Sequence, residues 1–132
     1  MPLSIRLDLH ATAPPAGAVV LTNTGPAELR LWRTGNTWGD PCLYFEISAA
    51  DHTRTITRSG LCYTRNVPSS VGVPPGASHV FPFDFGDGTW QYVPALQPGD
   101  RLTAIYAVPV TPDSIERNVW TGTLRSEPFV VS

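Results

Sequence analysis

The sequence predicts an all-β domain built as two packed layers of about seven to eight antiparallel strands. Three observations predict it. The chain has 14 Pro and 11 Gly residues, a frequency typical of short strands separated by turns. Apolar segments recur about every ten to fifteen residues, and each is bounded by turn residues. No segment carries an apolar stripe with the 3.6-residue period of a helix.

Length and charge exclude several classes of function. A chain of 132 residues fits a single domain, residues 1–132, that needs no disulfide or metal to fold. Nine basic residues against eleven acidic ones give a net charge of −2, which provides no basic excess for a phosphate backbone or an anionic membrane. We therefore expect no nucleic-acid partner and no membrane partner. The first residues alternate like a strand rather than a signal peptide, so a cytoplasmic protein is expected, or a secreted one if a leader has been removed.

Alternating apolar and polar residues place the first strands. Leu3 to Leu9 puts Leu and Ile on one face, which is expected in the core. Ala18 to Thr22 is the second strand. Asn23-Thr24-Gly25-Pro26 is expected as a tight turn, because Asn and Gly accept positive φ and Pro ends the ladder. A third strand is centred on Leu29 and Leu31.

The middle of the chain is predicted to form a hairpin. Cys42 to Ala49 is expected to pair with Thr53 to Arg65 about an Asp51-His52 turn, with a bulge at Gly60. Paired residue numbers then sum to about 104 or 105, which places Cys42 opposite or nearly opposite Cys62. The geometry allows a disulfide, but bridges between adjacent strands are strained and a reducing compartment is expected. Free thiols are the preferred interpretation.

The second half of the chain continues the pattern of short strands and turns. Phe81, Phe83 and Phe85 are expected as an aromatic cluster in the core. The predicted segments are a loop over Asn66 to Gly76, a strand over Ala77 to Phe85, a turn over Gly86 to Gly88, a short edge strand over Thr89 to Val93, a doubly buried strand over Arg101 to Val108, a loop over Pro109 to Asn118 and a last strand over Val119 to Val131.

Four strings of residues resemble known domains. They are Val20-Leu21-Thr22-Asn23-Thr24-Gly25, Phe45-Glu46-Ile47, Pro74-Pro75-Gly76-Ala77-Ser78 and Leu96-Gln97-Pro98-Gly99-Asp100. Together they resemble bacterial immunoglobulin-like domains. More narrowly they are similar to the non-catalytic N-terminal domain of deuterolysin-type metallopeptidases, and more loosely to intracellular proteinase inhibitors of Bacillus. The resemblance implies an antiparallel immunoglobulin-like β-sandwich of about seven to eight strands. The zinc-binding His-Glu-x-x-His motif of the peptidase is absent from the sequence, so peptidase activity is not implied.

The titratable residues show no pattern of a catalytic or metal site. His10, His52 and His79 lie on separate segments with no metal-ligand spacing, and no Ser or Cys stands in a nucleophile elbow. Asp84 and Asp87 lack the further oxygen ligands that calcium needs, so an Asp-Gly turn is preferred. We expect no cofactor, no metal and no catalytic residue, with a small enzyme whose pocket is invisible in the sequence as an alternative.

Tryptophans on predicted loops are the strongest indication of a binding surface. Such side chains anchor protein partners, stack on sugars or cover the ends of a core. Trp90 also stands in a turn-rich segment. An up-and-down strand order brings the loops over 11–17, 34–41, 66–76 and 109–118 to one end. The binding residues predicted at that end are Trp38, Asp40, Arg65, Asn66 and Trp120.

These observations favour a non-catalytic protein-binding or interaction module. Inhibition of a proteinase is one specific version, suggested by the family resemblance and by the Pro-rich loop Val67 to Gly76. Carbohydrate binding is an alternative, which exposed and coplanar indoles at Trp38 and Trp120 would favour.

Overall fold

A computed structural model describes residues 2–12, 14–58 and 66–132. None of the helices in these residues has the length and apolar character that a membrane span requires. The elements in chain order are β1 (Leu3–Thr12), β2 (Pro15–Asn23), β3 (Leu29–Trp32), the 3-10 helix η1 (Asp40–Cys42), β4 (Leu43–Ser48), β5 (Thr53–Arg58), β6 (Ser70–Val73), β7 (Ser78–Asp84), β8 (Trp90–Gln91), β9 (Arg101–Val108), α1 (Pro112–Glu116), β10 (Gly122–Arg125) and β11 (Phe129–Val130).

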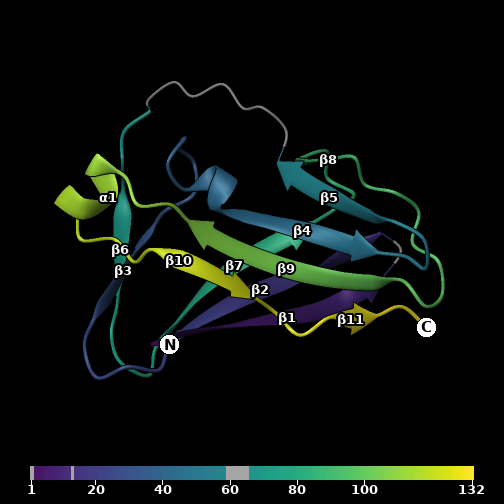
Figure 1. The fold of residues 1–132 in the computed structure, drawn as a ribbon, viewed down its shortest axis with the longest axis horizontal. Coiled ribbons are helices and arrows are strands. Elements are labelled where there is room, and N and C mark those ends of the chain that lie inside the picture. Colours follow the sequence, from purple (N-terminus) through teal and green to yellow (C-terminus); the bar gives the residue numbers. More distant parts are fainter. Residues whose placement is uncertain (1, 13, 59–65) are drawn as a thin grey trace.

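The strands form antiparallel sheets, which confirms the all-β prediction (Figure 1). One sheet has the order β1-β2-β7, and a larger one has the order β10-β9-β4-β5-β8, with β11 also paired to β9. β3 and β6 form a separate two-stranded ladder. This ladder lies at one end of the molecule (Figure 1). Unlike the long strands, β3 and β6 do not run from one end of the molecule to the other.

An aromatic cluster fills the core between the two larger sheets. The ring of Phe45 lies 4.7 Å from that of Phe83, 5.0 Å from that of Phe85 and 5.1 Å from that of Trp90. The predicted burial of Phe81, Phe83 and Phe85 is confirmed. Trp90 is buried as well, so it belongs to the core rather than to a loop surface.

The turn after β2 forms through a side chain rather than through positive φ. Neither Asn23 nor Gly25 has a positive φ, contrary to the backbone argument for this turn. Asn23 is fully buried, and its Nδ2 donates to the carbonyls of Ala27 and Val73 at 2.8 Å each. Its Oδ1 accepts from the Gly25 N–H at 3.0 Å. The side chain therefore fastens the end of β2 to the end of β6.

The β4–β5 hairpin has a different register from the predicted one. Ser48 pairs with Thr53, a shift of three to four residues, because the turn closes between Ala49 and His52 with a 2.8 Å hydrogen bond. Cys42 lies in η1, outside the ladder, and carries a free thiol. Three predictions lie outside the described residues: the position of Cys62 opposite or nearly opposite Cys42, the bulge at Gly60 and the strand beyond residue 58.

Two predicted loops contain regular structure, and the predicted last strand is divided. β6 lies in the 66–76 loop, and α1 in the 109–118 loop starts with a capping box in which Thr111 and Ser114 exchange hydrogen bonds. The last strand is interrupted at Ser126, whose N–H donates to the Ala104 carbonyl and whose hydroxyl accepts from the Ala104 N–H, both at 2.9 Å. Because Ser126 takes both backbone groups and Pro128 has no N–H, the ladder breaks between β10 and β11.

Candidate functional site

Three of the four loops predicted to share an end do so (Figure 1). The Asn66 side chain joins the 66–76 loop to the 34–41 loop, because it accepts from the Thr37 N–H at 3.0 Å and donates to the Thr37 hydroxyl at 3.1 Å. The 109–118 loop is joined to the 34–41 loop through the Trp38 indole, whose Nε1 donates to Asp113 Oδ2 at 2.7 Å.

The fourth loop, over 11–17, lies at the opposite end, which corrects the prediction (Figure 1). There the Phe85 N–H donates to the Pro15 carbonyl at 2.9 Å. The up-and-down count assumed that every strand crosses the molecule. The β3–β6 ladder does not, so the alternation of ends is shifted after β2.

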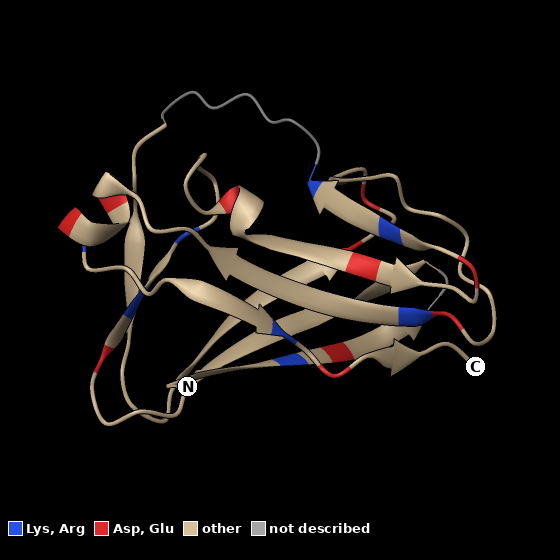
Figure 2. Cartoon of the chain, viewed as in Figure 1, with Lys and Arg blue, Asp and Glu red and all other residues tan. Residues whose placement is uncertain are grey.

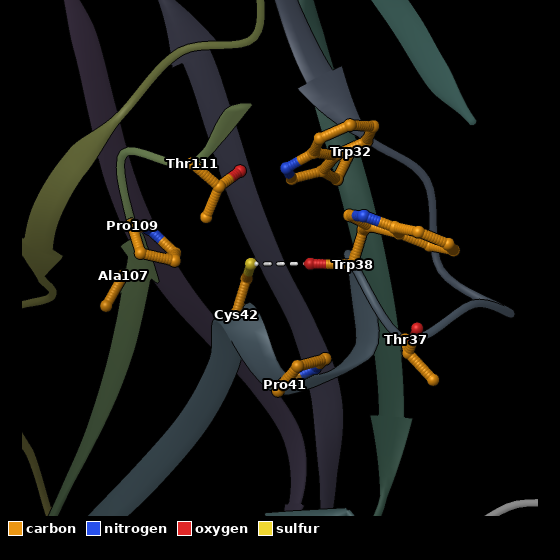
Figure 3. A pocket seen from close by; sticks show the side chains of 8 residues that line it. All are labelled: Trp32, Thr37, Trp38, Pro41, Cys42, Ala107, Pro109 and Thr111. Atoms are coloured by element: carbon orange, nitrogen blue, oxygen red, sulfur yellow. Dashed lines mark hydrogen bonds between the residues drawn. The ribbon is translucent and has the colours of Figure 1, made fainter. Parts of the chain in front are cut away.

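A pocket of about 280 Å³ opens at the shared end. Figure 3 shows two indoles on one side of it, and on the other side the end of β9 and the residues that follow. Cys42 lies between them, and its thiol donates to the Trp38 carbonyl at 3.1 Å. Most of the lining is apolar. The lining residues are Trp32, Thr37, Trp38, Pro41, Cys42, Ala107, Pro109 and Thr111.

A buried asparagine shapes the loop that carries Trp38. Asn36 is 3% exposed, and its Oδ1 accepts from the N–H groups of Trp38 at 3.0 Å and Gly39 at 2.8 Å. Its Nδ2 donates to the Arg33 carbonyl at 3.1 Å. A Cβ at position 39 would overlap that same carbonyl, so only glycine fits there. The half-buried Trp38 indole is thereby held between its own loop and α1.

Asp40, a predicted binding residue, is buried and supports the loop instead. Its Oδ1 accepts from the Gly35 N–H at 2.8 Å. Burial, and after it the negative charge of Asp40, raise the pKa of the Cys42 thiol to about 11. The thiol is therefore protonated at neutral pH, and a protonated thiol is a poor nucleophile.

Trp120 is separated from this pocket. Its ring stacks on Tyr106 with centroids 5.8 Å apart and 17° between the planes. The backbone N–H of Trp120 donates to the Arg30 carbonyl at 2.8 Å. The described lining of the Trp38 pocket does not include it. The structure thus brings Trp38, Asp40 and Asn66 around one loop, whereas Arg65 lies outside the described residues.

Sequence reasoning missed most of the pocket wall. Trp32 and Cys42 fall in or beside predicted strands, so they were not counted among the loop residues of a binding surface. Pro109 and Thr111 come from a segment distant in sequence, and no local pattern indicates that the two segments meet. Large apolar residues in predicted loops were the signal available at this end of the molecule. Val67, Val110 and Ile115 are 46%, 69% and 71% exposed, although none of them lines the pocket.

In comparisons with known proteins, the chain matches no family model, no curated protein and no solved structure. Within the described residues, no group of three or more His, Cys, Asp and Glu side chains is placed to hold a metal ion. The pocket offers apolar walls and aromatic faces, and its one thiol is held protonated. Such a surface is suited to bind an apolar group.

Proposed function

We propose that this chain is a non-catalytic protein-binding module with an immunoglobulin-like β-sandwich fold, and that the end around Trp38 receives an apolar side chain of a protein partner. The observation that carries the proposal is the apolar pocket of about 280 Å³. The loops that meet at this end also carry the exposed Val67, Val110 and Ile115, although none of the three lines the pocket. An apolar pocket at an end that also carries exposed apolar side chains is typical of protein contact surfaces. Tryptophan is also among the residues that contribute most to binding at such surfaces.

The carbohydrate alternative receives less support from the same residues. A sugar-binding platform needs flat aromatic faces open to solvent. Both Trp38 and Trp120 are half-buried, and Tyr106 covers one face of the Trp120 ring. Among the described residues that line the pocket, only Thr37 and Thr111 have polar side chains besides the indole N–H groups, so the described lining offers few groups to fix the hydroxyls of a sugar.

Proteinase inhibition is a finer version of the proposal. The part of the Pro-rich loop that precedes β6 contains the exposed Val67, whereas Ser70–Val73 is held in the ladder with β3. The segment 66–69 and the exposed segment 74–76 both lie outside this ladder. Of the two, 66–69 is joined to the Trp38 loop through the hydrogen bonds between Asn66 and Thr37, so its exposed Val67 is the side chain that this version presents to a proteinase. Titration of serine proteinases and metalloproteinases with the purified chain tests this version.

Selection of displayed peptides against the immobilised chain tests the general proposal without a known partner. We expect peptides with one large apolar residue. We expect Val110→Asp to weaken their binding at least about tenfold, because it places a charge between Pro109 and Thr111, which both line the pocket. Val130→Asp is the matched control, since Val130 is also exposed but lies on β11, far from the pocket (Figure 1). Equal effects of the two substitutions on peptide binding would contradict the proposal. Failure to select any peptide, together with selective binding of the chain on a glycan array, would contradict it as well.

A further inference from the structure

β1 is the free edge of the three-stranded sheet. It pairs with β2 on one side, and in the described part of the chain no strand pairs with its other side. The strand is ten residues long, contains no proline, and has a single irregularity between Leu9 and Ala11. A long regular edge exposes a row of backbone N–H and C=O groups, which can recruit a further strand.

The other edges of the two larger sheets are interrupted or short. The Asn23 N–H donates to the Ala77 carbonyl, so odd-numbered residues of β7 direct their backbone groups to β2 and even-numbered ones direct them outward. Pro82 is therefore at an outward position, where it offers no N–H. At the edges of the larger sheet, β8 has two residues and β10 has four.

The backbone of β1 has a defined alternation toward its free edge. The Thr24 N–H donates to the Pro2 carbonyl at 2.7 Å, and even-numbered residues of β1 pair with even-numbered residues of β2 up to Asp8. Because adjacent residues of a strand direct their backbone groups to opposite sides, Ile5 and Leu7 present their N–H and C=O groups to the free edge.

The side chains of β1 separate by face. Arg6 and Asp8 lie on the exposed face, where Arg6 Nε is 2.8 Å from Asp8 Oδ1 and the two side chains are 65% and 50% exposed. Figure 2 shows the basic and acidic positions next to each other along this strand. Ile5, Leu7 and Leu9 lie on the core face but are only partly buried. The free edge therefore combines an exposed charge pair with an incompletely covered apolar strip.

We propose that β1 pairs in antiparallel fashion with β1 of a second copy of this chain, about a twofold axis at Leu7. In this register Arg6 faces Asp8 of the second copy, and this contact occurs twice by symmetry. Ile5 then faces Leu9 of the second copy, and the apolar strips meet on the core side. The result is a continuous sheet of six strands, three from each copy.

Charge selects this register from its neighbours. Because only odd-numbered residues present their backbone groups to the free edge, an odd-numbered residue must pair with an odd-numbered residue of the second copy. The allowed registers therefore have their twofold axes one residue apart, at Arg6, Leu7 or Asp8. Centring the axis on Arg6 places two arginines opposite each other, and centring it on Asp8 places two aspartates opposite each other. Like charges directly opposite on adjacent strands are destabilising. The Leu7 register alone among the three matches opposite charges across the axis.

Charge reversal at the two exposed positions tests the pairing. Sedimentation equilibrium should show a concentration-dependent dimer for the natural chain, weakened at least about tenfold by Arg6→Asp alone and by Asp8→Arg alone. Mixing the two variants should restore association, because one chain is then acidic and the other basic at both positions. A monomer at every concentration, a dimer insensitive to both substitutions, or two dissociated variants that do not associate on mixing would each overturn the proposal.

Hydrogen exchange gives an independent readout of the same contact. The Ile5 and Leu7 amides should exchange slowly at concentrations where the dimer forms, and at least about tenfold faster after dilution to the monomer. The Val80 amide, at the outward edge of β7, should be unchanged by dilution. Protection at Val80 instead of at Leu7 would assign the dimer to a different edge and overturn the proposal.

Discussion

The Asn23→Ala substitution should be among the most destabilising single changes in this chain. It removes two donated hydrogen bonds of 2.8 Å and one accepted hydrogen bond of 3.0 Å from a side chain that is fully buried. Leaving a buried partner unsatisfied costs about 1 to 3 kcal/mol. Because two of the three partners are only partly buried, we expect a total loss of about 3 to 4 kcal/mol in the free energy of unfolding. For a chain of this length, that loss lowers the Tm by about 10 °C.

Asn66→Ala is the matched control. Asn66 also exchanges hydrogen bonds through both ends of its amide, but it does so on an exposed loop. Water can replace those partners, so we expect a loss below about 1 kcal/mol. Urea unfolding of the two variants and of the natural chain measures both values. Similar midpoints for Asn23→Ala and Asn66→Ala would refute the argument that the buried amide fastens β2 to β6.

Three further predictions follow from the contacts of single side chains. Trp120→Ala should lower the free energy of unfolding by about 2 to 3 kcal/mol, because the ring is partly buried and stacked on Tyr106; unchanged urea stability would show that the stacking contributes nothing. Ser126→Ala should cost about 1 to 2 kcal/mol, since the buried Ala104 N–H loses its acceptor, and an equally stable variant would contradict this. Burial raises the pKa of Cys42 from its ordinary 9.0 to about 11, so the folded chain holds this proton more tightly than the unfolded chain does. The contribution of Cys42 to the free energy of unfolding should therefore be fully present below about pH 9 and be lost as the pH rises to about 11. Cys42→Ala should flatten that decline. The raised pKa of Tyr106 should leave a residual slope at higher pH.

Alternation of apolar residues was sufficient to predict the long strands. β1, β2, β7 and β9 lie where the pattern places them, because each has one or both faces against the core. The short β6 was missed because prolines and glycines on both sides of it are typical of a loop. The last residue of β6 accepts a hydrogen bond from the buried Asn23 side chain. The turn-propensity argument treated Asn23 only as a source of positive φ, which it does not have.

The candidate site was predicted in part, for a related reason. The loop over 34–41 and its Trp38 were identified because aromatic residues in turns indicate a surface. The distribution of the tryptophans was not predictable in the same way. Trp120 packs on Tyr106, and Asp40 bonds within its own loop. Such contacts depend on which segments the tertiary fold brings together. Because the short β3 does not cross the molecule, the loop that follows it lies at the same end as the turn before it, which an up-and-down strand order does not predict (Figure 1).

The central claim is that the pocket beside Trp38 is the contact surface for a protein partner. The most direct test is the change in backbone amide chemical shifts when a selected apolar peptide is added to the isotope-labelled chain. We predict that the largest changes occur at 34–42, 66–69 and 107–117, and that Trp38→Ala weakens the peptide about thirtyfold without unfolding the chain. Shift changes confined to other elements, or full affinity after Trp38→Ala, would contradict the claim.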